Sequence, residues 1–137
     1  MSVQRRSRAR EIALQALYQA DLNPHAGPAE LERFVAARLH GGPIVPFAIG
    51  LVRGVQESLA ELDSFLDERA EHWRVARMAA TDRAILRLAA WEILHADTPP
   101  AVVADEAIEL AKRYGGEGSG SFVAGILGKI IADRKDA

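Results

Sequence analysis

Apolar residues recur every three to four positions along almost the whole sequence, and this spacing limits the possible fold more than any other feature. It places apolar side chains on one face of an α-helix, whereas a half-buried strand needs an apolar residue at every second position. Alternating β-branched runs are nearly absent, while alanine and leucine are abundant. The pattern therefore predicts an all-α fold, a single helical bundle without internal repeats or a domain linker.

Proline and glycine pairs divide this pattern into six predicted helices. The predicted helices cover about 5–21, 29–40, 45–70, 81–96, a segment from the Pro99-Pro100 pair to 114, and a last segment from Ser119 or Ser121. The 45–70 helix carries a nearly heptad-spaced stripe typical of a bundle seam, made of Ala48, Leu51, Val52, Val55, Leu59, Leu62 and Leu66. We expect Thr81 or Asp82 to cap the fourth helix and Gly115 to end the fifth in the left-handed conformation. Gly125 and Gly128 are expected to permit close approach of a neighbouring element.

Composition excludes several classes of protein. The 137 residues contain no cysteine, so disulfides and thiolate chemistry are excluded. No apolar run has the length of a membrane span or follows the basic N-terminus as in a signal peptide, and we expect a cytoplasmic protein with no membrane partner. Residues 1–10 carry a charge of +4, and the remainder carries −6. This asymmetry favours local attraction of an anion at the N-terminus.

The sequence offers no catalytic constellation. Four histidines lie on different predicted elements without metal-ligand spacing, which favours scattered surface histidines over a metal site. No nucleophile and base pair is identified, so we expect a protein that is not an enzyme and has no cofactor. The segment GGEGSGSF leaves two interpretations open. It is either a helix end, a turn and a helix cap, or a set of exposed amides that receive a phosphate at the start of the last helix.

Four arginines, Arg5, Arg6, Arg8 and Arg10, begin the first predicted helix. At 100° per residue, Arg10, Leu14 and Tyr18 form a row that is turned away from the apolar face. Arginine can bind phosphate with two hydrogen bonds, and a tyrosine ring can stack on an unpaired base. The alternative is that Leu14 and Tyr18 pack on another helix or on a second subunit. Because the arginines do not share one stripe, a further alternative assigns Arg5 and Arg6 to a mobile arm.

Four segments, RRSRAREIALQALYQ, TDRAILRLAAWEI, ADEAIELAKRYG and SFVAGILGKI, resemble the NusB family of bacterial transcription antitermination factors in order and spacing. The resemblance implies about six to seven helices in two packed helical bundles, within a compact single domain over residues 1–137. It also implies a non-catalytic protein that binds boxA, a short single-stranded RNA element, together with the ribosomal protein NusE. Such a protein acts with the transcription elongation complex during ribosomal RNA synthesis.

The same resemblance nominates site residues in two parts of the chain. The RNA surface would combine the arginine-rich segment 1–10 and its helix with the start of the last helix. Its predicted residues are Arg5, Arg6, Arg8, Arg10, Tyr18, Gly118, Ser119, Ser121 and Phe122. The match for the NusE-facing surface is looser and falls around Asp82 and Arg83.

The chain departs from the family's pattern at four polar positions. Gly118 stands where the family usually has an acid, Ser121 where it often has a base, and Ala124 and Asp105 where it favours Asn. The departures change the local charge in both directions, and each phosphate contact adds roughly one unit to the salt dependence of binding.

An alternative is a NusB-fold paralogue that acts as a homodimer or protein-interaction module with weak or no RNA binding. It is motivated by the altered polar positions Asp105, Ser121 and Ala124 and by the outward Leu14 and Tyr18, which a partner could cover. A third interpretation is the NusB-like domain of a ribosomal RNA cytosine methyltransferase. This chain has no glycine-rich cofactor loop or catalytic cysteine, so it could be such a domain only as a fragment.

Overall fold

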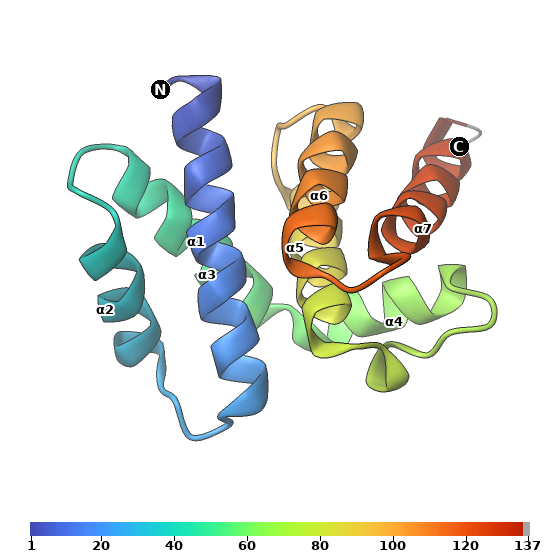
Figure 1. The fold of residues 1–137 in the computed structure, drawn as a ribbon, viewed down its shortest axis with the longest axis horizontal. Helices are drawn as coiled ribbons and strands as arrows, with labels where there is room; N and C mark the ends of the chain where they lie inside the picture. The colour runs from blue at the N-terminus through green and yellow to red at the C-terminus, as the bar shows by residue number, and fades with distance from the viewer. Residues whose placement is uncertain (136–137) are drawn as a thin grey trace. The chain divides into compact units, whose positions relative to one another are not determined.

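A computed structural model describes residues 1–135, and this part of the chain consists of helices joined by short loops (Figure 1). Its elements are α1 (Val3–Leu22), α2 (Pro28–Arg38), α3 (Ile44–Glu57), α4 (Leu59–Arg69), the 3-10 turn η1 (Val75–Arg77), α5 (Ala80–His95), α6 (Pro100–Tyr114) and α7 (Ser119–Lys135). The all-α prediction is confirmed. Proline begins α2 and α6 at the first helical turn, where its missing N–H has no intrahelical partner to lose.

The chain divides into two compact helical units, Met1–Glu57 and Ser58–Ala137. In the first unit, α1 packs against α2 and α3, and α2 packs against α3. In the second unit, α5 packs against α4, α6 and α7, and α6 packs against α7. The predicted two helical bundles are therefore present. A single domain over 1–137 stays a prediction, and residues 136–137 lie outside the described part.

Each unit buries the apolar face that its periodicity predicts. The core of the first unit includes Ile12, Val35, Ala48, Val52 and Val55. The core of the second unit includes Leu62, Leu66, Ile85, Leu86, Leu127 and Ile130. Burial of each Val, Leu or Ile side chain contributes roughly 1.5–3 kcal/mol before the loss of chain entropy is counted.

The predicted single helix over 45–70 is wrong, because two helices, α3 and α4, cover this segment. The backbone leaves the helical conformation at Ser58, with φ −119° and ψ 17°. Leu62 N nevertheless donates to Ser58 O at 2.9 Å, so α4 starts directly after the break. All residues of the predicted stripe except Leu59 are buried. The apolar period therefore continues across the break, and neither proline nor glycine marks the boundary.

The first helix begins earlier than predicted. Ser2 caps α1, and its Oγ accepts a hydrogen bond from Arg5 N at 3.2 Å. Arg6 N donates to Ser2 O at 3.1 Å. Arg5 and Arg6 are therefore helical residues, and their assignment to a mobile arm is wrong.

Three expectations about helix ends and packing are also corrected. Ala79, not Thr81 or Asp82, is the N-cap of α5, and no side chain caps this helix. Gly115 ends α6 with φ −83°, outside the left-handed region. No described atom of another element lies within 4 Å of a Cβ built on Gly125 or Gly128, so these glycines do not permit a close approach.

Candidate nucleic-acid interface

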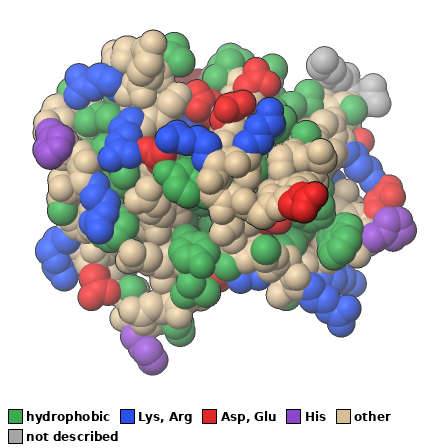
Figure 2. Space-filling model, viewed as in Figure 1, with side chains coloured by type: hydrophobic (Ala, Val, Ile, Leu, Met, Phe, Trp, Pro, Cys, Tyr) green, Lys and Arg blue, Asp and Glu red, His purple; other side chains and the backbone are tan. Residues whose placement is uncertain are grey.

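The amino-terminal half of α1 presents three exposed arginines, Arg5, Arg6 and Arg8. Arg8 forms an ion pair with the buried carboxylate of Glu11, one turn further along the helix. Within residues 1–135, neither Arg5 nor Arg6 forms an ion pair. Figure 2 shows Lys and Arg side chains gathered over the amino-terminal half of α1 and over α2. Because α1 is ordered from Val3, these cations are presented from a fixed backbone rather than from a tail.

The predicted outward row of Arg10, Leu14 and Tyr18 is wrong for two of its three members. Arg10 is 4% exposed and Leu14 is 2% exposed, while Tyr18 is 37% exposed. The Arg10 guanidinium carbon lies 5.6 Å from the centroid of the Phe47 ring of α3, a cation–π contact. The six residues from Ala9 to Leu14 cover the whole circumference of the helix, and all are buried. The helical wheel located an apolar face correctly but did not show that the opposite side is covered too.

This correction changes which side chains of α1 can meet a ligand. Arg5, Arg6, Arg8 and Tyr18 are exposed, whereas Arg10 is engaged inside the protein. A direct contact between Arg10 and RNA stays a prediction, and it would require its covering neighbours to move. The burial of Leu14 also removes one observation behind the homodimer alternative.

The second predicted group lies where the chain enters α7. Gly118 has φ +84°, so it and not Gly115 is the residue that uses the left-handed conformation. Phe122 N donates to Gly118 O at 2.9 Å, which anchors the first turn of α7. Gly118 and Ser121 are exposed, Ser119 is buried, and Phe122 is half-buried. Of the predicted residues here, Gly118 and Ser121 are therefore the most accessible to a phosphate.

Close packing in this loop explains why position 115 is a glycine. A Cβ on Gly115 would lie 2.5 Å from the Cβ and Oγ of Ser119 and 2.6 Å from the carbonyl oxygen of Ala111. Only a residue without a side chain allows the end of α6 to approach the start of α7 in this way. The requirement is steric, and it positions the first turn of α7.

Two further residues border this region and were not predicted as site residues. The aliphatic part of Lys112 on α6 lies against Gly120, where a built Cβ would be 3.1 Å from Lys112 Cγ. The Trp73 ring packs edge-to-face on the Phe122 ring, with centroids 5.7 Å apart and an interplanar angle of 82°. The available sequence signal for Trp73 was an aromatic residue between two polar neighbours, in the segment that joins the predicted helices over 45–70 and 81–96.

The two predicted groups belong to different units. The α1 residues lie in Met1–Glu57, and Gly118, Ser119, Ser121 and Phe122 lie in Ser58–Ala137. The first group lies on α1, and the second group comprises Gly118 and the first residues of α7. Their union into one RNA-binding surface stays a prediction.

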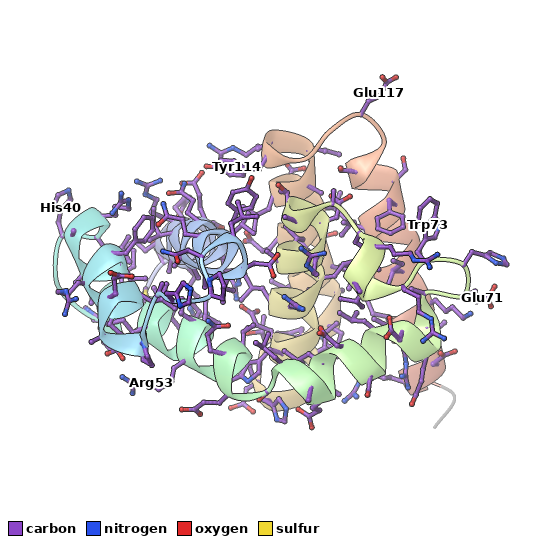
Figure 3. The ribbon with its side chains drawn as sticks, turned by 90° about the horizontal axis from the view of Figure 1, so that it is seen from below. His40, Arg53, Glu71, Trp73, Tyr114 and Glu117 are labelled. Carbon is purple, nitrogen blue, oxygen red and sulfur yellow. The ribbon has the colours of Figure 1, made fainter. Side chains whose placement is uncertain are left out.

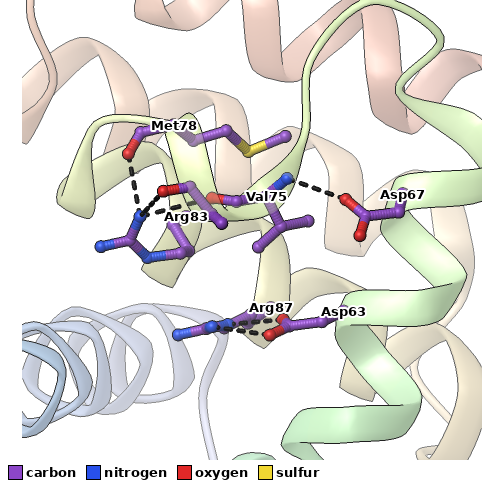
Figure 4. A network of polar contacts seen from close by, with 7 residues as sticks. Asp63, Asp67, Val75, Met78, Arg83 and Arg87 are labelled. Atoms are coloured by element: carbon purple, nitrogen blue, oxygen red, sulfur yellow. Dashed lines mark hydrogen bonds and ion pairs between the residues drawn. The ribbon is translucent and has the colours of Figure 1, made fainter.

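The two predicted partner-facing residues lie at the start of α5. Arg83 Nη1 donates to the carbonyl oxygens of Met78 at 2.9 Å and Val75 at 3.3 Å, and so holds η1 in place (Figure 4). Asp82 Oδ1 is buried and has no hydrogen-bond partner among the described residues. Arg83 therefore stabilises the η1 turn through its hydrogen bonds. Contact of Asp82 or Arg83 with NusE stays a prediction.

Polar contacts around α4 complete the framework of the second unit. Arg87 of α5 donates to Asp63 of α4 through Nε and Nη2, both at 2.8 Å (Figure 4). Asp67 Oδ1 accepts from Val75 N at 2.8 Å, which ties the loop after α4 to that helix.

Two other kinds of site are absent from residues 1–135. No group of three or more His, Cys, Asp or Glu side chains is placed to hold a metal ion. No helix in this described part combines the length and apolar character needed to cross a membrane.

Comparison with known proteins gives one family. The sequence model of the NusB family matches residues 7–132. The transcription antitermination protein NusB of Anaeromyxobacter dehalogenans is 46% identical over 129 residues, covering 93% of this chain and 91% of that protein. NusB of Geobacillus kaustophilus is also 46% identical over 129 residues, covering 93% and 96%.

Solved structures agree with this match. T. maritima NusB superposes with a TM-score of 0.84 at 36% identity, covering 93% of this chain and 91% of that one. A crystal structure of the antitermination factors NusB and NusE in complex with double-stranded RNA contains a chain with a TM-score of 0.86 at 25% identity, covering 96% and 99%.

Proposed function

Because the chain belongs to the NusB family, we propose that it is a transcription antitermination factor that binds boxA-type single-stranded RNA together with NusE. It acts in the cytoplasm with the transcription elongation complex, promotes ribosomal RNA transcription and carries out no catalysis of its own. The relatives' names support antitermination, and the solved complex of NusB, NusE and RNA supports both kinds of partner.

The observation that carries RNA binding is the group of three exposed arginines, Arg5, Arg6 and Arg8, on the first turns of α1. Residues 1–57 carry a net charge of +2, and residues 58–137 carry −4. The phosphate backbone is therefore attracted to the first unit, where Arg5 and Arg6 form no ion pair with any residue of the described part, 1–135. Arginine suits this task because its guanidinium remains charged and donates two parallel hydrogen bonds to phosphate.

A binding titration tests the proposal. Fluorescence anisotropy of a labelled boxA-type strand would be measured at about 50 and 200 mM salt, with and without NusE. A scrambled strand and a double-stranded form of the same sequence are the comparison ligands. We expect the boxA-type strand to bind most tightly, NusE to increase its affinity, and salt to weaken it. Equal affinity for the boxA-type and scrambled strands would contradict specific recognition.

A pair of variants with equal charge locates the surface. Arg5→Gln/Arg6→Gln removes two exposed charges from α1, and Arg33→Gln/Arg53→Gln removes two exposed charges from α2 and α3. If both α1 arginines contact phosphate, the first variant makes the fall of log affinity with log salt shallower by about 1.4 units, about 0.7 for each lost contact. The second variant should leave this slope nearly unchanged. Equal losses in both variants would show that only net charge matters.

A further inference from the structure

The most exposed large aromatic side chain of the second unit is Trp73, in the loop between α4 and η1. It is 58% exposed, although tryptophan is highly buried on average because its ring has a large apolar area. Figure 3 shows its ring on the outer side of the second unit, next to α7. Trp91, the other tryptophan, is half-buried, and its ring packs against His95 on the same helix. Contacts within the second unit therefore leave more than half of the Trp73 surface exposed to solvent.

The loop that carries Trp73 is held in place on both sides of this residue. Trp73 N donates to Ala70 O at 2.6 Å, and Val75 N donates to Asp67 Oδ1 at 2.8 Å. Glu71 forms an ion pair with Lys129 of α7 (Figure 3 labels Glu71). The indole is therefore presented from an ordered turn, which reduces the entropy lost when a ligand binds to it.

The ring that Trp73 contacts belongs to the predicted RNA-binding residues. This partner is Phe122, and the two rings pack edge-to-face with their centroids 5.7 Å apart. An edge-to-face pair uses at most one face of the indole, so the other face remains available for parallel stacking. The two rings join the Trp73 loop to the first turn of α7.

Charges next to the indole suit a nucleic-acid strand. Arg74 is the next residue, and its side chain is 75% exposed. Two acids of this region each face a cation, since Asp67 Oδ2 lies 3.8 Å from Arg74 Nη1 and Glu71 pairs with Lys129. Negative charge near the indole is thus largely balanced, and Arg74 can exchange its long, exposed ion pair for a phosphate.

We propose that Trp73 is a base-stacking residue of the RNA-binding surface. An unpaired base stacks on the free face of the indole, and Arg74 contacts a phosphate next to that base. This inference rests on the proposed RNA-binding function and assigns to it a residue in the α4–η1 loop. Stacking of a base on an aromatic side chain tolerates any base, so Trp73 adds affinity for single strands rather than sequence preference.

The intrinsic fluorescence of Trp73 gives a direct test. In Trp91→Phe, Trp73 is the only tryptophan, and its emission reports on its own surroundings. We expect the boxA-type single strand to quench this emission in parallel with binding measured by anisotropy. A double-stranded RNA of the same sequence, which offers no unpaired base, should bind without comparable quenching.

Two substitutions separate stacking from structure. Trp73→Ala should weaken binding of the single strand on the order of 10-fold, and Trp73→Phe should restore much of the loss because phenylalanine also stacks. Val102→Ala, which removes another exposed apolar side chain on α6, is the matched control and should leave binding unchanged. If Trp73→Ala fails to fold, Trp73→Phe and the quenching experiment still decide.

The outcomes distinguish this inference from the function on which it rests. Tight binding by the unaltered protein, with no quenching and no loss in Trp73→Ala, overturns the stacking role and leaves RNA binding intact. Loss of NusE binding with unchanged RNA binding in Trp73→Ala also overturns it, since the indole would then face a protein. Absence of RNA binding by the unaltered protein, with and without NusE, overturns both proposals.

Discussion

Substitution of Gly115 by alanine should destabilise the protein for a purely steric reason. The new Cβ would lie 2.5 Å from Ser119 Cβ and 2.6 Å from the backbone oxygen of Ala111. Neither atom is the end of a flexible side chain, so relief requires the start of α7 to move away from the end of α6. The φ of −83° is acceptable for alanine, and the backbone conformation at 115 adds no penalty.

The expected magnitude follows from these two contacts. Overpacking a close contact by one methyl group costs about 1–3 kcal/mol. Replacing glycine by alanine also restricts the unfolded chain, which returns about 0.4–1 kcal/mol. A net loss of about 1–2 kcal/mol remains, and for a chain of this length it corresponds to a fall in Tm of roughly 4–8 °C.

Neighbouring glycines supply matched controls for the same measurement. Gly116 has no described atom within 4 Å of a built Cβ and no positive φ, so Gly116→Ala should leave Tm unchanged or raise it slightly. Gly118 also faces open space but has φ +84°, so Gly118→Ala should cost about 1–2 kcal/mol through the backbone alone. Thermal unfolding followed by circular dichroism compares all three variants. A Gly115→Ala protein as stable as Gly116→Ala would refute the steric reasoning.

Three further predictions concern polar contacts. Arg87→Ala should lower the free energy of unfolding by about 1–2 kcal/mol, because it removes both hydrogen bonds to Asp63, whose side chain is 34% exposed. A double-mutant cycle with Asp63→Ala, measured by urea unfolding, should show coupling between the two residues. Additive losses would contradict the contact. The pKa of Glu71 is lowered because Lys129 donates a hydrogen bond to its carboxylate and adds positive charge, so the contact stabilises the protein above the ordinary glutamate pKa and is lost as pH falls through the lowered pKa. In Lys129→Gln, an NMR titration should show the Glu71 pKa rising toward its ordinary value. Identical titrations of the two proteins would argue against the pair. Ser2→Ala removes the side-chain cap of α1 and should destabilise its first turn by about 1 kcal/mol. The amide hydrogens of this turn should then exchange faster with solvent. Unchanged exchange would show that the cap does not stabilise the helix.

Local chemistry made much of the fold predictable. The 3.6-residue period identified the helical segments without separating α3 from α4, and the Pro99-Pro100 pair marked the start of α6. Buried residues such as Leu62 and Ile85 were recognised because only side chains on the apolar face can leave water without losing hydrogen bonds. The exposed arginines at the start of α1 were recognised from charge alone, and their helical order follows from the cap at Ser2.

Long-range contacts explain the predictions that failed. Whether the side of α1 opposite its apolar face is covered depends on elements distant in sequence, such as Phe47 beside Arg10, and a helical wheel contains no such information. The end of α3 at Ser58 was missed because the apolar period is the same on both sides of the break. A period specifies which side chains are buried, but not whether the helix axis continues.

The sequence by itself determined an all-helical protein with a basic start and, through its four motifs, the NusB family. These properties depend on residue type and spacing, which act over a few turns of helix. Only the tertiary structure decided which arginines of α1 reach solvent and that Trp73 meets Phe122 from a fixed loop. Those facts depend on contacts between segments up to about fifty residues apart, and such contacts form only when the helices pack.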